Sequence, residues 1–292
     1  METKERLTYF LDLDGTLLDK RNSQIISYKN IETIRFLQQY ANVVISTGRN
    51  YTDPKVQAII KLLNIKDVIA SSGAEIYIDG TLVKKYSIDE KTIRQIRIFA
   101  SAAKISFVSF HNQGDSFYSS NPFFLALARR FAKKKFFEIK HHNDYEENEE
   151  VWKISFVISK LFTAKSLLKK MKLFFDDKLN LNLASNNFVL EITNIKADKG
   201  LAASTYCKFK GINLRNTIHI GDSMSDLSTK GYVGKLIAMG NSSKELKNNA
   251  DFVGPKFSKA GIAKIIQWSL NIPFKKEFKQ DKKDLKKIKS TL

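Results

Sequence analysis

Hydrophobic and polar positions follow two alternating patterns through the first 80 residues. Short apolar runs at residues 9–11, 42–45 and 67–70 are typical of strands that are buried on both faces of a sheet. The segments between them, 25–40 and 52–64, place apolar residues at helical spacing. Strands that alternate with helices in this way predict a parallel sheet covered by helices.

The pattern changes after Asp79-Gly80, a pair typical of a hairpin turn, and residues 81–193 predict a separate α+β unit. Its predicted order is αββαβαββ, with paired strands and the helices on one side. The helices are predicted at 91–104, 121–135 and 162–175, and the strands at 105–110, 116–119, 152–159, 179–184 and 188–192. The cations within 129–135 are interpreted as a solvated helix face, with contact to an anionic substrate as the alternative.

The alternation of strands and helices then resumes toward the C-terminus. The predicted elements are helices at 201–210 and 261–270 and strands at 217–220, 235–241 and 251–254. We therefore expect an α/β fold with a Rossmann-like, doubly wound parallel sheet built from residues 1–82 and 193–292 and an α+β domain inserted at 83–192. The Lys-rich tail at 273–292 is expected to pack loosely.

The composition is that of a globular chain and excludes several classes of protein. The chain has 292 residues, 43% of them hydrophobic, and no apolar stretch approaches the roughly 20 residues that span a bilayer. Its first residues run into Asp12 and Asp14 instead of a signal-peptide core, so we expect a cytoplasmic protein. A single cysteine, Cys207, excludes an intramolecular disulfide and argues against a zinc cluster.

The net charge of +19 is compatible with an anionic partner, whether a nucleic acid, a membrane surface or a phosphorylated metabolite. Charge alone does not choose among these partners. Nucleic acid is the least favoured, because the sequence contains no legible module of basic and aromatic residues. A mutational bias toward A and T codons would produce the same abundance of Lys, Asn, Ile and Phe.

Two acids follow the first predicted strand, in the stretch Asp12-Leu13-Asp14-Gly15-Thr16. Open α/β sheets bind ligands at the carboxyl edge of their strands, and two carboxylates there concentrate negative charge that favours a hard cation. The glycine permits the turn at which the strand ends. These residues alone leave open an ordinary Asp-Gly turn without chemistry.

Two later strand ends carry related residues. The second strand ends in Thr47-Gly48-Arg49, which supplies the hydroxyl, the accessible backbone N–H groups and the cation that a phosphate oxygen needs. The strand at 217–220 ends in Gly221-Asp222, and Asp226 follows where it can either ligate a cation or orient Asp222. Taken alone, both stretches are also explained by turns and helix N-caps. His219 precedes these acids on the strand and is expected to be buried, not catalytic.

Together, four motifs resemble in their order those of the haloacid dehalogenase superfamily, and specifically of its Cof-type phosphatases. The motifs are Asp12-Leu13-Asp14-Gly15-Thr16, Thr47-Gly48-Arg49, Lys199-Gly200, and Gly221-Asp222 with Asp226. The resemblance spans residues 10–261 and includes the closing stretch at 238–241. The inserted domain is similar to the large C2-type cap that this family carries between its second and third motifs.

The resemblance implies a Mg²⁺-dependent phosphatase that acts on small phosphorylated metabolites, sugar phosphates or phosphorylated cofactors, through an aspartyl-phosphate. Asp12 is then the nucleophile, and Asp14 is the general acid and base. The metal-binding residues that it implies are Asp12, Asp14 through its backbone carbonyl, Asp222 and Asp226. The substrate-binding residues that it implies are Thr47, Gly48, Lys199 and Ser225.

Two serines depart from the family pattern, which commonly has asparagine at both positions. They are Ser225, before the last acid of the fourth motif, and Ser72, after the third strand. Serine keeps a donor but has a shorter reach, so a phosphate or cap contact is expected to be weaker or water-mediated. Two other functions stay open, namely a phosphosugar mutase on the same fold and a non-enzymatic binder of nucleic acid or phospholipid that uses the basic charge. The sequence selects no oligomeric state.

Overall fold

The computed structural model describes residues 6–18, 26–132, 137–142, 144, 149–158, 164–175, 177–184 and 188–270. The chain divides into two compact units, a core of Met1–Lys84 with Lys199–Leu292 and a cap of Lys85–Asp198. These boundaries lie a few residues beyond the predicted ones at 82/83 and 192/193. Within the described residues, no helix has both the length and the apolar character needed to cross a membrane. The Lys-rich tail at 273–292 and the cations at 133–135 lie outside the described residues.

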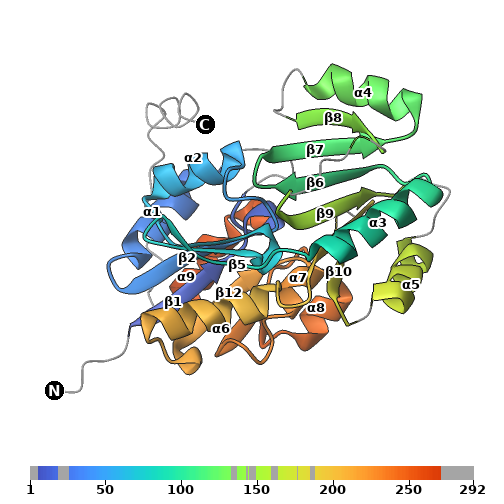
Figure 1. Cartoon of the computed structure of the whole chain (residues 1–292). Helices are drawn as coiled ribbons and strands as arrows, with labels where there is room; N and C mark the ends of the chain where they lie inside the picture. Colours follow the sequence, from blue (N-terminus) through green and yellow to red (C-terminus); the bar gives the residue numbers. More distant parts are fainter. Residues whose placement is uncertain are drawn as a thin grey trace. The chain divides into compact units, whose positions relative to one another are not determined.

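The core contains an eight-stranded sheet in the order β14-β13-β12-β1-β2-β3-β4-β5 (Figure 1). Its strands are β1 (Leu7–Leu11), β2 (Ala41–Ser46), β3 (Val68–Ala70), β4 (Glu75–Ile78), β5 (Thr81–Lys85), β12 (Thr217–Gly221), β13 (Lys235–Ala238) and β14 (Phe252–Val253). Neighbours from β14 to β3 pair in parallel, and β4 is antiparallel to β3. The chain winds outward from β1 to β3 and later fills the other side with β12, β13 and β14. The predicted doubly wound α/β fold is therefore confirmed.

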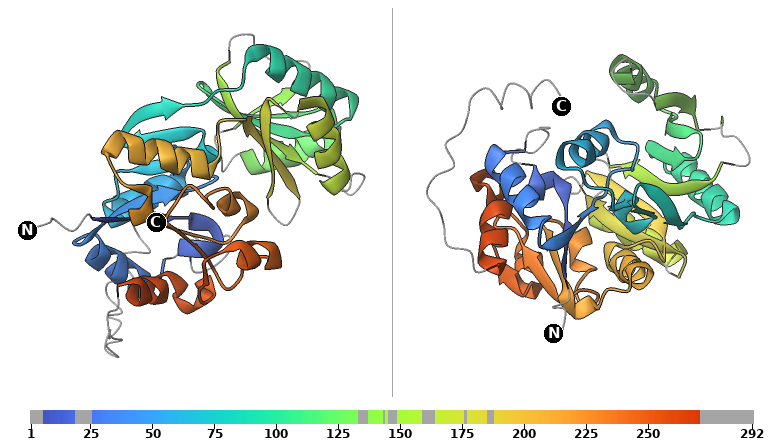
Figure 2. Two further views of the ribbon diagram at one scale, coloured as in Figure 1. Left: turned by 90° about the horizontal axis from the view of Figure 1, so that it is seen from below. Right: turned by 90° about the vertical axis from the view of Figure 1, so that its left-hand side faces the viewer.

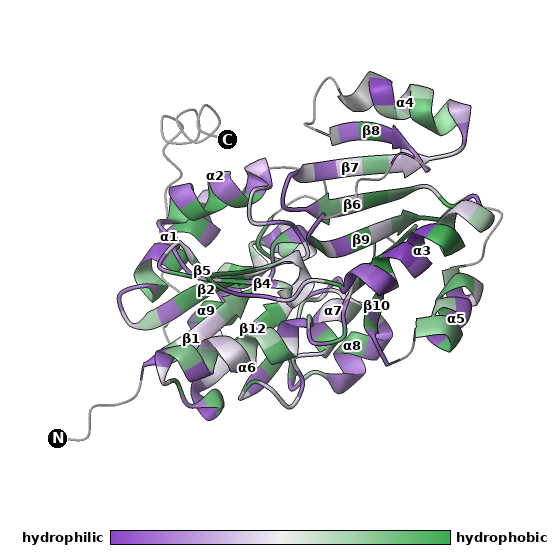
Figure 3. Cartoon of the chain, viewed as in Figure 1, coloured by the Kyte–Doolittle hydropathy of each residue, from purple (hydrophilic) through white to green (hydrophobic). Residues whose placement is uncertain are grey.

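Helices cover both faces of the core sheet. On one face, apolar residues of α1 (Tyr28–Leu37), α2 (Pro54–Leu63) and α9 (Gly261–Ser269) form one cluster with those of β1, β2 and β12. On the other face, α6 (Lys199–Lys210) packs against the sheet, and the ring of its Tyr206 meets Phe10 edge-on. In Figure 3, hydrophobic and hydrophilic colours alternate along α2 and α6, as expected for helices with one buried face.

The register of the central strands brings three strand ends to one edge. Leu11 at the end of β1 lies opposite Ile220 of β12 and Ile45 of β2. Asp12, Asp222 and Thr47 follow these positions by one or two residues and so lie at the carboxyl edge of the sheet. The winding direction changes at β1, and α/β sheets bind their ligands at such a switch point.

The cap contains a six-stranded sheet in the order β10-β11-β9-β6-β7-β8. Its strands are β6 (Phe107–His111), β7 (Gly114–Ser119), β8 (Phe137–His141), β9 (Val151–Val157), β10 (Leu179–Ala184) and β11 (Val189–Asn194). Helices α3 (Glu90–Ala102) and α5 (Ala164–Phe175) share one apolar cluster on the same side of this sheet (Figure 2). Helix α4 (Pro122–Ala132) connects β7 to β8, which pair in parallel.

The structure adds short elements that the sequence pattern does not predict. The strand β8 changes the order of the cap from the predicted αββαβαββ to αββαββαββ. It occupies the edge of the sheet, and its stretch Phe137–His141 includes Glu138 and Lys140, which weaken the apolar signal. In the core, α7 (Met224–Leu227) and α8 (Lys244–Asn249) are too short to show helical periodicity in the sequence.

Candidate active site

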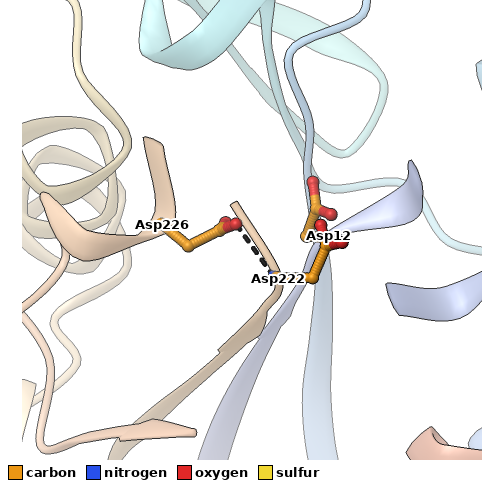
Figure 4. Close-up of side chains that lie close together, drawn as sticks. All are labelled: Asp12, Asp222 and Asp226. Carbon is orange, nitrogen blue, oxygen red and sulfur yellow. Dashed lines mark hydrogen bonds between the residues drawn. The ribbon is translucent and has the colours of Figure 1, made fainter. Parts of the chain in front are cut away.

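Three carboxylates gather at the carboxyl edge of the core sheet. Asp12 follows β1, Asp222 follows β12 and Asp226 lies in α7, and one oxygen atom of each is within 4.8 Å of the others. Figure 4 shows Asp12 and Asp222 next to one another at their strand ends, with Asp226 pointing toward them from α7. Their exposed fractions are 5%, 9% and 0%, respectively. The structure thus brings together three of the four residues predicted to bind a metal.

The turn after β1 is shaped around the side chain of Asp222. Gly15 has a φ of +81°, a left-handed conformation that favours glycine. A Cβ atom at this position would lie 2.2 Å from Oδ2 of Asp222. The Nδ2 group of Asn241 donates hydrogen bonds to that same oxygen (2.8 Å) and to the carbonyl of Gly15 (2.9 Å). The absence of a side chain at Gly15 therefore leaves the space in which the carboxylate of Asp222 approaches Asp12.

Asp226 is held by five hydrogen bonds. Its Oδ1 accepts from Nζ of Lys199 (2.7 Å) and from Nε2 of His219 (2.8 Å). Its Oδ2 accepts from the backbone N–H of Asp222 (3.1 Å) and from both the backbone N–H and the hydroxyl of Ser223 (2.8 Å each). Proximity alone includes Asp226 among possible metal ligands, but these five donors favour the alternative in which it orients Lys199 and the Asp222 backbone.

The ammonium group of Lys199 joins two of the carboxylates. Lys199 is the first residue of α6 and is 1% exposed, and its Nζ lies 2.8 Å from Oδ1 of Asp12 and 2.7 Å from Oδ1 of Asp226. Burial alone would lower the pKa of Lys199, but the two carboxylates raise it above its ordinary value. Lys199 therefore carries a positive charge inside the core.

The two carboxyl groups that share Lys199 differ in their ionisation. Burial raises the pKa of Asp12 well above its usual range; Lys199 opposes this rise, whereas Asp226 and Asp222 add to it. Burial also acts to raise the pKa of Asp226, but Lys199 and His219 outweigh it and hold that pKa well below its usual range. Asp226 is thus the ionised partner of Lys199, and Asp12 needs further positive charge nearby to be fully ionised.

Asp14 is paired with Arg49 and lies outside the cluster of carboxylates. Nε and Nη2 of Arg49 donate to the two carboxylate oxygens of Asp14 at 2.6 and 2.8 Å, and Nη1 donates to Asp53 at 2.9 Å. The sequence predicts Arg49 as a cation for a phosphate oxygen, whereas in the structure these carboxylates engage its guanidinium. The side chain of Asp14 is 42% exposed, which makes it accessible to a group with which it would exchange a proton.

The second motif is fixed to the neighbouring strand β3. The backbone N–H of Thr47 donates to the carbonyl of Ile69 (2.9 Å), and the backbone N–H of Ser72 donates to the carbonyl of Thr47 (3.0 Å). Thr47 is 1% exposed, and its Oγ1 accepts from the backbone N–H of Arg49 (3.2 Å), which spans Gly48. These hydrogen bonds hold the backbone of the second motif in place. The phosphate-binding roles of Thr47 and Gly48 stay predictions.

The two serines that replace asparagine lie in different settings. The hydroxyl of Ser225 is 2.9 Å from that of Ser223, which in turn bonds to Asp226. Ser225 thus lies in α7 beside the serine that holds Asp226, and its contact with a substrate stays a prediction. Ser72 has a φ of +58°, a left-handed conformation that asparagine adopts more readily than serine.

One residue of this edge, Asn241, had no role predicted from the sequence. It bridges the carboxylate of Asp222 and the backbone of Gly15, as described above. The available signal was its position, because Asn241 follows β13, the strand next to β12 at the same edge of the sheet.

The donor set at this edge fits a hard divalent cation. Carboxylate oxygens such as those of Asp12 and Asp222 are ligands that Mg²⁺ prefers, and the backbone carbonyl of Asp14 stays a predicted ligand. Within the described residues, the cluster sets three carboxylates around the single ammonium of Lys199, which leaves the site with net negative charge. A bound cation would lower the raised pKa of Asp12.

Known proteins resemble this chain over most of its length. A protein-family model described as haloacid dehalogenase-like hydrolase matches residues 9–266. The chain is 28% identical to the phosphatase YwpJ of Bacillus subtilis, over 88% of this chain and 97% of that protein. It is 29% identical to the 5-amino-6-(5-phospho-D-ribitylamino)uracil phosphatase YwtE of the same organism, over 89% of this chain and 97% of that protein.

Solved structures with the same fold match this chain over most of its length. A haloacid dehalogenase-like hydrolase from B. subtilis superposes with a TM-score of 0.73 at 25% identity, covering 89% of this chain and 98% of that one. A subclass IIB sugar phosphatase superposes with a TM-score of 0.79 at 19% identity, covering 91% of this chain and 100% of that one. At this lower identity, the likeness is one of fold.

Proposed function

Because the chain belongs to the haloacid dehalogenase-like hydrolases and is a phosphatase of phosphoric monoesters, we propose that it depends on Mg²⁺ and works through an aspartyl-phosphate on Asp12. The observation that carries this proposal is the meeting of Asp12 and Asp222 at one sheet edge, with the ammonium of Lys199 2.8 Å from Asp12. A carboxylate is a weak nucleophile toward a phosphate dianion and becomes effective when cations neutralise the phosphoryl oxygens.

In the first step, Asp12 attacks the phosphorus atom of the ester. Lys199 binds Oδ1 of Asp12, so Oδ2 is the oxygen that forms the new bond. The bond from phosphorus to the ester oxygen breaks, and Asp14, which has left its ion pair with Arg49 and taken a proton from solvent, gives that proton to the leaving alcohol. In the second step, Asp14 takes a proton from water, the water oxygen attacks phosphorus, and the bond to Asp12 breaks to release inorganic phosphate.

The remaining predicted residues hold the phosphoryl group during both steps. The hydroxyl of Thr47, the backbone N–H of Gly48 and the ammonium of Lys199 donate to its oxygens. The metal would be held by Asp12, the carbonyl of Asp14 and Asp222, while Asp226 acts through Lys199 and the Asp222 backbone. Bound Mg²⁺ would supply charge stabilisation for the phosphoryl oxygens.

The proposed substrates are small phosphorylated metabolites, namely sugar phosphates or phosphorylated cofactors, that a cytoplasmic enzyme would meet. The name of the relative YwtE, a phosphatase of a phosphorylated ribityl compound, supports this class. The cap at residues 83–192 is proposed to select among them. A panel that includes sugar phosphates, flavin mononucleotide, pyridoxal phosphate and the YwtE substrate identifies the preferred compound by its kcat/KM.

Phosphate release from a chromogenic phosphate ester, with and without Mg²⁺, tests the chemistry. We expect Asp12→Asn to be inactive and Asp79→Asn to match the wild type. Asp79 is a suitable control because it is exposed in a turn with a φ of +51°, which asparagine tolerates. In rapidly quenched wild-type enzyme, mass spectrometry should find a phosphoryl group on the peptide that contains Asp12. Equal turnover by Asp12→Asn and the wild type would refute the mechanism.

A further inference from the structure

A buried histidine lies against this site and takes no part in the proposed steps. His219 lies on β12, three residues before Asp222, and is 0% exposed. In the register of the sheet it lies opposite Phe10 on β1 and Leu236 on β13, both of which are also 0% exposed. A polar ring in such apolar surroundings lowers stability unless it is hydrogen-bonded. The hydrogen-bond partner of His219 therefore points to the role of this residue.

The hydrogen bond of His219 is directed at Asp226. Its Nε2 lies 2.8 Å from Oδ1 of that residue, while Nδ1 has no hydrogen-bond partner among the described residues. A carboxylate can only accept, so Nε2 carries a proton, and in a neutral ring Nδ1 then carries none. Burial lowers the pKa of His219, and the hydrogen bond to Asp226 only partly opposes this, which is consistent with a neutral ring.

We propose that His219 is a positioning residue that fixes the carboxylate of Asp226 and, through it, the ammonium of Lys199 against the nucleophile Asp12. The inference rests on the proposed function and adds a residue to it. Oδ1 of Asp226 accepts from His219 and Lys199 together. The donor from His219 therefore occupies one side of that oxygen and leaves the other side for Lys199.

The position of Lys199 depends on this sharing. Its ammonium lies almost midway between two acceptors, 2.7 Å from Asp226 and 2.8 Å from Asp12. Without the donor from His219, Oδ1 of Asp226 becomes a stronger acceptor, and its carboxylate is freer to turn about the Cβ–Cγ bond. Lys199 then moves toward Asp226, and its positive charge stabilises both Asp12 and the phosphoryl group less.

Two substitutions separate positioning from simple packing. His219→Leu removes the donor and suits the apolar slot, whereas His219→Gln keeps a side-chain N–H that reaches the position of Nε2. We expect kcat of His219→Leu to fall about tenfold, the lower end for residues that orient an active-site group. KM should change little, and the midpoint of thermal unfolding should stay at or above that of the wild type. His219→Gln should recover most of kcat.

A nitrogen-15 NMR spectrum at neutral pH gives a readout that is independent of turnover. The chain has four histidines, so loss of one imidazole signal set in His219→Gln assigns His219. We expect a protonated Nε2 and an unprotonated Nδ1. The proposal is overturned by a protonated Nδ1, by wild-type kcat in His219→Leu, or by a kcat in His219→Gln as low as that of His219→Leu.

Asp12→Asn, assayed in parallel, keeps the two proposals distinguishable. An inactive Asp12→Asn beside a fully active His219→Leu would remove only the role of His219. Full activity in Asp12→Asn would instead remove the proposed mechanism, whatever the histidine variants show.

Discussion

Replacing Gly15 by alanine should disable the proposed metal site while the fold stays intact. The backbone at Gly15 has a φ of +81°, and the new Cβ would lie 2.2 Å from Oδ2 of Asp222 and 2.7 Å from its Cγ. The substitution therefore has two separable effects. One is the conformational cost of a side chain in a left-handed conformation, about 1–2 kcal/mol of stability. The other is displacement of the Asp222 carboxylate.

The displacement follows from the contact distance. To reach an ordinary separation of about 3.5 Å from the Cβ atom, Oδ2 of Asp222 must withdraw by roughly 1.3 Å. The hydrogen bond from Asn241 to the same oxygen, 2.8 Å long, would be strained or lost. Since a misplacement of about 1 Å costs on the order of 100-fold in rate, we expect kcat/KM of Gly15→Ala to fall by about that factor. The Mg²⁺ concentration for half-maximal activity should rise.

Gly211→Ala is the matched control. Gly211 also has a left-handed backbone, with a φ of +66°, but its Cβ would meet nothing within 4 Å. Both variants should lose similar stability in urea unfolding, whereas only Gly15→Ala should lose turnover and Mg²⁺ affinity in a titration of phosphate release. If the two variants had the same kcat/KM and the same Mg²⁺ dependence, the placement of Asp222 against Gly15 would be irrelevant to function.

Three further outcomes are expected. The pKa of Asp226 lies below its usual range, so its ionised form stabilises the fold at pH values above the pKa of an unfolded aspartate, about 3.9. This stabilisation is lost as the pH falls below that value. The free energy of unfolding of Asp226→Asn, measured in urea, should therefore depend less on pH between about 2 and 5 than that of the wild type. The pKa of Asp12 is raised, so its ionisation lowers the stability of the fold at neutral pH. In EDTA at pH 7, Asp12→Asn should therefore unfold at a higher temperature than the wild type. Added Mg²⁺ should raise the unfolding temperature of the wild type more than that of Asp12→Asn. In the cap, Arg97→Met removes the shorter of the ion pairs that Arg97 and Lys140 make with the buried carboxylate of Glu149 and leaves that of Lys140, at 3.7 Å. This change should cost about 3 kcal/mol, the lower end for breaking a buried pair, whereas Arg94→Met, at an exposed pair, should cost less than about 1 kcal/mol; urea denaturation measures both.

The site residues that directly follow a strand could be predicted from the sequence. Apolar runs that stop at Asp12, at Thr47 and at Asp222 predict parallel strands, and the carboxyl ends of parallel strands share an edge. The structure brings these residues to that edge. The pairing of Asp14 with Arg49 lies outside such reasoning, because it depends on side-chain directions in two loops 35 positions apart.

Elements with weak local signals were also beyond prediction. The strand β8 lies at a sheet edge, where charged residues are tolerated, and the helix α4 separates it in the sequence from its partner β7. The strand forms by pairing with β7, and the residues of Phe137–His141 alone do not predict that pairing. The helix α8, six residues long, is likewise set by its cap at Ser243 and by the burial of Leu246.

The stretch after β12 shows why the structural and the chemical interpretations of a motif need not exclude one another. Taken alone, Asp222 and Asp226 are explained by a turn with a helix N-cap, and that explanation is correct: Oδ2 of Asp226 accepts from the backbone N–H of Ser223 at the start of α7. The same carboxylate uses Oδ1 to hold Lys199. Asp53 divides its oxygens in the same way between the first turn of α2, at Lys55, and the guanidinium of Arg49. In both places a helix start binds one oxygen of a carboxylate and leaves the other oxygen to orient a cation of the site.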